Sequence, residues 1–312
     1  MINKTCICSV FIFIFLILFQ GIYCAYGEKA AVVIKSQDIS AYNEAIDGFK
    51  SECIKNNISI KYIYDMKGKM KIGYKILREI KKDEPDIILT IGILATTIVK
   101  EEIKDIPIIF CMVINQGRFK LAGLNITGIT TEIAIEKQLE GYKDLLNSLQ
   151  DIGVIYDPSK TGNIVESAEL KMKGLGVNLV KYKIKSSKMV SKALDSLIGK
   201  VDAIWILPDS TVVTKKSFDL IKYTTLKNNT PLLCTTDAFV KAGALAAVFS
   251  DYKSIGKQAA QLAKKLLTVS PAGSLGIVFP DEFKLSINSN TAKKLGLELK
   301  PVRGKPHVIV YP

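Results

Sequence analysis

The chain has 312 residues, of which 48% are hydrophobic and 23% are charged, and its formal net charge is +13 at pH 7. This composition excludes a disordered chain, and the length suits two packed α/β lobes better than one small domain. The lysines are scattered, without a long basic run or arginine–aromatic interleaving. The charge therefore indicates a solvated surface, or attraction to anionic lipid headgroups or to an acidic partner.

The first residues have the order of parts of a secretory signal. Lys4 supplies a positive start, Val10–Phe19 is an unbroken apolar run, and Ala25 and Gly27 place small residues before a cleavage point. We therefore predict a signal peptide or N-terminal anchor over residues 1–27. The anchor stays open as an alternative because the uncharged stretch is long enough to span a bilayer if it is not cut.

A lipid-modified Cys24 is a further alternative, although the bulky Tyr23 before it does not fit that motif. Each of these interpretations places the rest of the chain outside the cytoplasm, in the periplasm or on the outer face of the cytoplasmic membrane. Export argues against a nucleic-acid partner.

Beyond the leader, short apolar strands alternate with segments of helical periodicity. The first half predicts strands at 30–35, 58–64, 86–91 and 108–113, with helices at 41–56, 69–82 and 95–103. Gly92 turns the chain from the third strand into a helix, and Pro107 precedes the fourth strand.

The same order recurs in the second half of the chain. Strands are predicted at 151–156, 177–184, 201–206 and 232–234, with a loop at 157–163, a helix ending near 174, a helix at 187–198, a turn at 207–210 and a helix through 227. Strands that alternate with helices pair in parallel with right-handed crossovers. The repeat therefore predicts an α/β fold with two doubly wound parallel-sheet lobes and a ligand cleft between them.

In an open parallel sheet, ligands gather beyond the carboxyl ends of the strands. The loops at those ends supply the candidate ligand-binding residues, which are Ser36, Gln37, Gly92, Ile93, Ala95, Thr96, Asn115, Asp157, Asp209, Ser210, Thr236 and Asp237. Backbone N–H groups of the helix opened by Gly92, with the Thr96 or Thr97 hydroxyl, suit a carboxylate or another anion. The three aspartates suit an ammonium group. The same residue types also cap ordinary strand–helix turns, so a purely structural role stays open.

The residues that most enzymes and metal sites need are scarce in this sequence. The one histidine, His307, stands beside the apolar run Val308–Val310 and is expected on an edge strand. No zinc motif, Cys/His cluster or phosphate-binding loop occurs. We therefore predict no enzyme activity, no cofactor and no metal. Three separated cysteines beyond the leader indicate small buried side chains rather than a disulfide framework: Cys53, Cys111 and Cys234.

Several segments carry, in their order along the chain, a resemblance to a known family. They are 105–110, 125–129, 201–213, 243–246, 252–267 and 287–297, and the last is close to an I-N-x-x-T-A-x-x-L-G pattern. Together they resemble the ABC-transporter substrate-binding family related to tryptophan- and tyrosine-binding proteins, which has the type I periplasmic-binding-protein fold (periplasmic-binding-protein-like I). The similarity covers almost the whole chain beyond the leader.

The resemblance implies hinges near Thr127-Gly128, Ser250-Asp251 and Pro280. It divides the chain into one lobe of 28–126 plus 251–280 and another of 127–250 plus 281–312. It also implies a monomeric solute-binding component of an importer, which would trap an amino acid or similar small zwitterion by hinge closure and present it to an ABC permease.

One segment departs from the family pattern. After the strand ending near Val113, family members usually carry an Asp-Pro step, whereas this chain reads Ile114-Asn115-Gln116-Gly117. The departure lies in the expected cleft and leaves the ligand open. A membrane-tethered small-molecule sensor or interaction domain without a transport partner is the alternative. An extracytoplasmic α/β enzyme is disfavoured because the sequence offers neither a catalytic histidine nor a metal-binding cluster.

Overall fold

A computed structural model describes residues 29–268, 271–299 and 304–312 of the chain. The predicted leader, residues 1–27, lies outside these residues. Within the described ranges, no helix is both long enough and apolar enough to cross a membrane.

The first lobe is built on a six-stranded sheet in the order β11-β5-β4-β3-β1-β2, in which every pairing is parallel. Its strands are β1 Lys29–Lys35, β2 Ile58–Asp65, β3 Ile87–Ile91, β4 Ile108–Val113, β5 Ile126–Thr130 and β11 Ile277–Val278. Its helices are α2 Ser40–Lys55, α3 Met70–Asp83, α4 Ile93–Glu102 and α10 Tyr252–Thr268, with short 3-10 turns η1 Gln116–Phe119 and η3 Ala272–Leu275.

Helices cover both faces of this first sheet. Along β1, Ala31 and Val33 pack with α2 and α10, whereas Val32 and Ile34 pack with α3 and α4. Alternate side chains of a strand point to opposite faces, so a strand that is apolar at every position needs a helical layer on each side. The unbroken apolar run of β1 thus explains the three-layer build.

The second lobe is built on a seven-stranded sheet in the order β13-β12-β10-β9-β8-β6-β7. Its strands are β6 Asp151–Tyr156, β7 Asn178–Lys183, β8 Ala203–Ile206, β9 Leu232–Cys234, β10 Ala246–Ser250, β12 Phe283–Asn288 and β13 Val308–Tyr311. Its helices are α5 Ile135–Lys143, α6 Pro158–Gly174, α7 Val190–Leu197, α8 Lys215–Lys227, α9 Asp237–Lys241 and α11 Ser289–Lys294, with η2 Ser187–Met189. β12 runs antiparallel to β10, and the other pairings are parallel.

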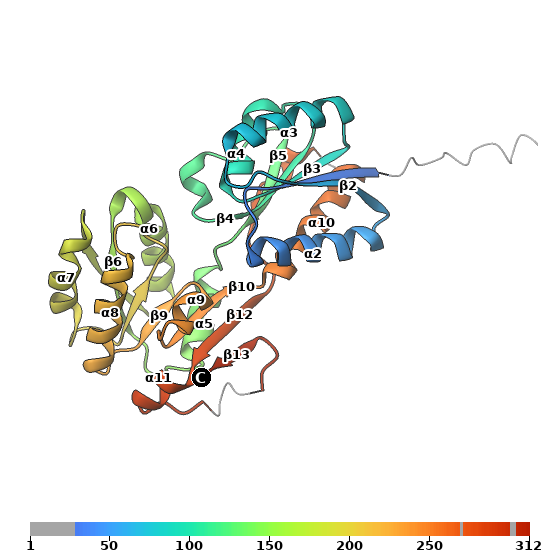
Figure 1. The fold of residues 1–312 in the computed structure, drawn as a ribbon. Coiled ribbons are helices and arrows are strands. Elements are labelled where there is room, and N and C mark those ends of the chain that lie inside the picture. Colours follow the sequence, from blue (N-terminus) through green and yellow to red (C-terminus); the bar gives the residue numbers. More distant parts are fainter. Residues whose placement is uncertain (1–28, 269–270, 300–303) are drawn as a thin grey trace, which may run out of the picture.

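The repeat predicted from the sequence is confirmed by the strand orders. The first sheet contains β2-β1-β3-β4-β5 and the second contains β7-β6-β8-β9-β10, which is the same doubly wound order built twice. Figure 1 shows the two sheets in separate lobes. The expected edge strand beside His307 is β13, which pairs only with β12. The three predicted buried cysteines are buried and unpaired.

The chain passes between the two sheets at three places. It leaves the first sheet after β5, returns between β10 and α10, and crosses again between β11 and β12. The expected hinges Ser250-Asp251 and Pro280 lie in the second and third passages. Thr127 and Gly128 lie inside β5, so the first passage follows Thr130, a few residues beyond the expected boundary.

One predicted loop is helical in the structure. Residues 157–163 were expected as a loop because of their polar composition, but α6 begins at Pro158. Asp157 is the N-cap, and its carboxylate accepts the backbone N–H of Ser159 at 2.9 Å. A proline at the first helical position and a capping aspartate favour helix initiation, and these local signals outweigh the polar composition.

Helices α2 and α10 lie side by side across a glycine contact, although about 200 residues of chain separate them. A Cβ on Gly48 would overlap the carbonyl oxygen of Lys253, and a Cβ on Gly256 would overlap the carbonyl oxygen of Ala45. The backbones therefore approach more closely than any side chain allows. This contact holds the first helix after the second passage against the first lobe.

We predict that Gly256→Ala lowers the free energy of unfolding by about 1–3 kcal/mol, because the added methyl group must push the two helices apart. Urea unfolding followed by circular dichroism measures the change. Gly174→Ala is the control, since a Cβ there meets nothing within 4 Å, and its effect should stay within about 0.5 kcal/mol. Equal effects of the two substitutions would contradict the close contact.

Candidate ligand cleft

The loops that follow β1 and β3 meet at the point where the strand order of the first sheet reverses. The N–H of Ser36 donates to the carbonyl of Ile91 at 2.9 Å, and its hydroxyl donates to the same carbonyl at 3.0 Å. The same hydroxyl accepts the N–H of Ala95 at 3.0 Å. Ser36 thus connects the end of β1 with the end of β3 and the first turn of α4 by hydrogen bonds. The neighbouring Gln37 is exposed.

Gly92 allows this junction to form. Its φ is 84°, a conformation that L side chains rarely adopt, and the Tyr42 hydroxyl occupies the place of a Cβ. Tyr42 comes from the first turn of α2, and sequence reasoning did not single it out. Its position just after the loop that follows β1 was the available signal.

The first turn of α4 keeps only part of its hydrogen-bonding capacity for a ligand. Thr96 is fully buried, and its hydroxyl bonds the Gly92 carbonyl at 2.9 Å and the Thr90 hydroxyl at 3.0 Å. The N–H of Ala95 already donates to the Ser36 hydroxyl, so it is not available to a ligand. The N–H groups of Ile93 and Leu94 have no hydrogen-bond partner among the described residues. The positive end of α4 therefore offers two backbone donors rather than the predicted hydroxyl.

The matching loops of the second lobe are closed by their own hydrogen bonds. The Asp209 carboxylate, on a residue that is 1% exposed, accepts the N–H of Asp157 at 2.8 Å and the Thr161 hydroxyl at 2.7 Å on one oxygen. Its other oxygen accepts the N–H groups of Thr211 and Val212 at 2.9 and 3.2 Å. The structure therefore gives Asp209 the role of a loop organiser.

Asp157 is held in a similar way. One oxygen accepts the Thr211 hydroxyl at 2.7 Å, and the other accepts the N–H and hydroxyl of Ser159 at 2.9 and 2.8 Å. Hydrogen bonds from Thr211 and Ser159 hold the pKa of Asp157 below its ordinary value. Ser210, which lies between Asp209 and Thr211 in the sequence, is exposed.

Asn115 joins the two lobes. Its residue is 7% exposed and lies after β4 with a φ of 51°, a left-handed conformation that asparagine tolerates. Its side-chain amide donates to the Lys160 carbonyl at 2.7 Å, and its side-chain oxygen accepts the amide of Asn163 at 2.9 Å. Both partners belong to α6, so loops from the carboxyl ends of the two sheets touch here.

Glu132 lies in the first passage between the lobes, and sequence reasoning missed it. Its carboxylate accepts the N–H of Asn115. Burial raises the pKa of Glu132, while hydrogen bonds from its own N–H and from those of Asn115 and Thr131 act in the opposite direction. This passage thus carries a carboxyl group for which the charged form is unfavourable.

Asp237 lies at the start of α9 in the second lobe and stays partly exposed. Its side chain is 21% exposed and forms an ion pair with Lys241 at 2.6 Å. The same oxygen accepts the Tyr311 hydroxyl at 3.2 Å, and the Lys241 ammonium lies 5.0 Å from the Tyr311 ring centre. Thr236, the N-cap residue of α9, is half-buried, and its side chain makes no capping hydrogen bond.

Tyr252 lies where the second passage enters α10 and packs against core residues of both lobes. Burial raises its pKa to about 12, and the negative charges of Asp237 and Glu44 add to the shift. Glu44 belongs to α2 of the first lobe and Asp237 to the second, so negative charges of both lobes act on this hydroxyl, and the positive charge of Lys241 opposes them. Proximity to the expected hinge at Ser250-Asp251 was the sequence signal for Tyr252.

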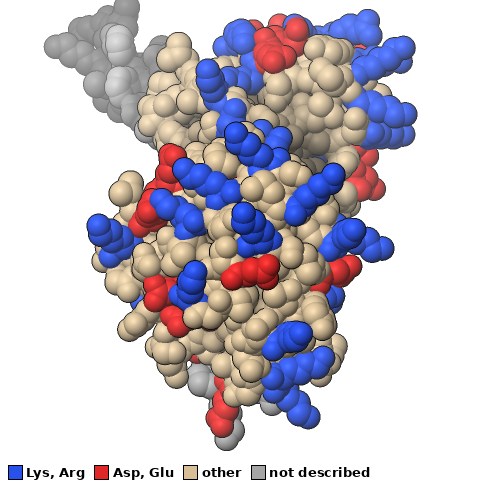
Figure 2. Space-filling view, turned by 90° about the vertical axis from the view of Figure 1, so that its left-hand side faces the viewer, with Lys and Arg blue, Asp and Glu red and all other residues tan. Residues whose placement is uncertain are grey.

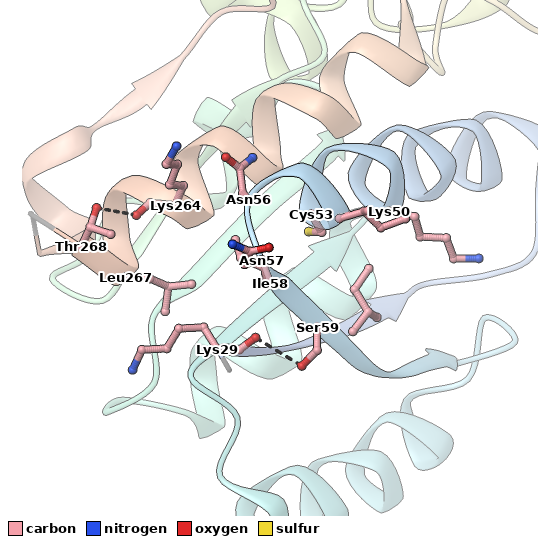
Figure 3. A pocket seen from close by; sticks show the side chains of 12 residues that line it. Lys29, Lys50, Cys53, Asn56, Asn57, Ile58, Ser59, Lys264, Leu267 and Thr268 are labelled. Atoms are coloured by element: carbon pink, nitrogen blue, oxygen red, sulfur yellow. Dashed lines mark hydrogen bonds between the residues drawn. The ribbon is translucent and has the colours of Figure 1, made fainter. Parts of the chain in front are cut away.

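Two hollows in the described structure lie away from these loops. One of about 1010 Å³ lies between the starts of β1 and β2 and the C-terminal ends of α2 and α10 (Figure 3). The other, of about 720 Å³, is lined by residues such as Asp202 and Asn229, before β8 and β9. Both lie at the amino ends of the strands, opposite the cleft loops, and neither is lined by a predicted ligand-binding residue.

We predict that Glu132→Gln stabilises the protein more at pH 7 than at pH 4. A raised pKa means that the folded state holds the proton more tightly, so stability present below the unfolded-state pKa is lost as pH rises through the folded-state value. Glutamine does not ionise, so the variant keeps the stability that the wild type loses as the pH rises. Thermal unfolding at both pH values measures the difference between variant and wild type.

Glu136→Gln is the matched control for this measurement. A hydrogen bond from its own backbone N–H, followed by that from Lys171, lowers the pKa of Glu136, so its substitution should lose stability towards neutral pH. An effect of Glu132→Gln that is equal at both pH values would contradict the assignment.

Comparison with known proteins agrees with this architecture. The profile of the family described as ABC transporter substrate binding protein matches residues 31–302. A Clostridioides difficile (strain R20291) protein named Tyrosine-binding protein is 28% identical over 251 residues, which cover 78% of this chain and 72% of that protein.

Two solved structures share the fold. The ligand-free, open structure of a substrate binding protein with adhesive properties from Clostridium difficile has a TM-score of 0.77 and 23% identity, covering 91% of this chain and 100% of that one. The ABC domain from Streptococcus pneumonia in complex with L-Trp has a TM-score of 0.63 and 18% identity, with coverage of 91% and 100%. The family match spans nearly all described residues, and the two lobes have the fold of its relatives. The chain therefore belongs to the ABC transporter substrate-binding protein family, a family of solute-binding proteins rather than enzymes.

Proposed function

We propose that this protein is the exported, extracytoplasmic solute-binding component of an ABC importer, and that it takes up an amino acid between its lobes by hinge closure. The observation that carries the proposal is the direct contact of Asn115, after β4 of the first sheet, with α6, after β6 of the second, in a molecule whose lobes are joined by three chain passages. Passages of this kind allow two rigid lobes to rotate about a few residues. A membrane permease is the expected partner that receives the ligand.

The ligand we propose is a zwitterion with an aromatic side chain. Its carboxylate would accept the N–H groups of Ile93 and Leu94 at the positive end of α4. Its ammonium group would lie near Asp237 and Glu44, whose charges both act on the hydroxyl of Tyr252. Asp209 drops out of this role because its two oxygens are filled by internal hydrogen bonds.

Two further features support an aromatic ligand. Tyr42 and Tyr252 stand at the cleft ends of α2 and α10 and are half-buried, so they can offer ring faces and hydroxyls to a guest. A relative 28% identical to this chain is named as a tyrosine-binding protein, and a structural relative was solved with L-Trp.

We predict that tyrosine, phenylalanine or tryptophan raises the melting temperature of the purified protein in a thermal-shift screen against amino acids and small amines. A ligand at a hundred times its Kd adds about 2.7 kcal/mol of stability when it binds only the folded state. No response to any of these zwitterions would contradict the proposed ligand class.

Asp237→Ala tests the ammonium site with the ligand found in that screen. Its Kd should rise at least about tenfold, or about 1.4 kcal/mol, because the substitution removes one of the two carboxylates proposed to lie near the ammonium group. Asp219→Ala is the matched control, since Asp219 pairs with Lys222 one turn along α8, as Asp237 pairs with Lys241 along α9. An unchanged Kd for Asp237→Ala would remove this residue from the site.

A further inference from the structure

Helix α3 presents a row of positive charges to solvent. Lys71, Lys75, Arg78 and Lys82 are all exposed. They follow one another at spacings of four, three and four residues, which places them along one line of the helix surface. The opposite side of α3, with Ile76, Leu77 and Ile80, is buried against the first sheet. The helix can therefore offer only this basic row and its flanks to a partner.

Acidic neighbours offset the row only in part, since Glu79 alone stands four residues after Lys75 and three before Lys82. None of its four members forms an ion pair with a described residue, whereas Lys81, on the flank, pairs with Glu102 of α4 at 3.1 Å. Glu79 and Asp83 lie on the other flank, since their charges help to raise the pKa of Tyr64 on β2, behind the main effect of burial. Like charges three and four residues apart destabilise a helix. The sequence therefore retains a repulsive arrangement along this face.

The row is flanked by exposed apolar surface. Met70 is 53% exposed and Tyr74 is 42% exposed, and both lie on the flank that carries Lys81. Tyr74 has an apolar ring and a polar hydroxyl and therefore favours the boundary between water and the lipid headgroups, and Met70 offers an apolar side chain beside it. A basic face bordered by such side chains is typical of a surface that rests on a membrane.

The position of α3 leaves the cleft free. Figure 1 shows α3 on the outer side of the first lobe, away from the second lobe. Its C-terminal end leads to β3, where Asp86 pairs with Lys29 at 2.9 Å and accepts the N–H of Ala30 at 2.8 Å. The incoming chain thus enters the first lobe beside the end of the basic row.

We propose that the basic row of α3 docks on the anionic lipid surface of a membrane, independently of what the cleft binds. Phosphate-bearing headgroups form an extended plane of negative charge, which a straight row of long, flexible cationic side chains can follow without a shaped pocket. Figure 2 shows basic side chains spread over another face of the molecule as well, so the whole chain adds a weaker general attraction.

The test is co-sedimentation of the chain from Glu28 onward, which holds every described residue and omits the apolar leader. Vesicles of equal parts phosphatidylglycerol and phosphatidylcholine should bind it at low salt, with binding falling as salt is added, and phosphatidylcholine vesicles should not. The variant K71Q/K75Q/R78Q/K82Q should reduce partitioning onto the mixed vesicles at least about tenfold.

The matched control removes the same charge from the second lobe. The variant K183Q/K185Q/K188Q/K192Q changes four exposed lysines on and after β7, and it should bind the mixed vesicles nearly as well as the wild type. Circular dichroism checks that both variants are folded, and the α3 variant should melt no lower than the wild type because repulsion is relieved. Equal losses in the two variants, or a wild type that does not bind the mixed vesicles, would overturn the proposal.

Discussion

Helices α2 and α10 meet at Gly48 and Gly256 with no side chain between their backbones, and the position of α10 in the first lobe depends on this contact. Helix α10 begins directly after the second passage, so its packing against α2 determines where the chain re-enters the first lobe. The same packing places Tyr252 between the lobes, where its side chain contacts core residues of both. A shift of α10 would therefore move the passage, the tyrosine and one wall of the cleft together.

The cleft loops are largely organised before any ligand arrives. Ser36 closes the junction of the first lobe, and Asp209 with Asp157 closes that of the second, through hydrogen bonds between neighbouring strand ends. Organisation of this kind lowers the ordering cost of binding, because the loops need not be fixed by the ligand. Among the described loop residues, the N–H groups of Ile93 and Leu94 have no hydrogen-bond partner, Asp237 is partly exposed, and Gln37 and Ser210 are exposed.

The passages between the lobes have a chemistry of their own. Glu132 accepts the N–H of Asn115, and Asn115 reaches across to α6. The departure from the family at Asn115-Gln116 thus falls on an interlobe contact. This position bears on how the lobes are held, because Asn115 is hydrogen-bonded to Glu132 in the first passage and to α6 of the second lobe.

The sequence by itself determined the alternation of strands and helices, the internal repeat and the family, because these depend on local periodicity and on segment order. It also located the loops at the carboxyl ends of the strands, since topology follows from that alternation. The helical start of α6 at Pro158 was missed because polar composition hid a local capping signal. Only the tertiary structure decided the roles of individual loop residues. Asp209 and Asp237 look alike in the sequence. The carboxylate of Asp209 accepts four internal hydrogen bonds, whereas that of Asp237 stays partly exposed to solvent. Tyr42, Glu132 and Tyr252 gain their positions from contacts between segments far apart in the chain, which no local pattern encodes.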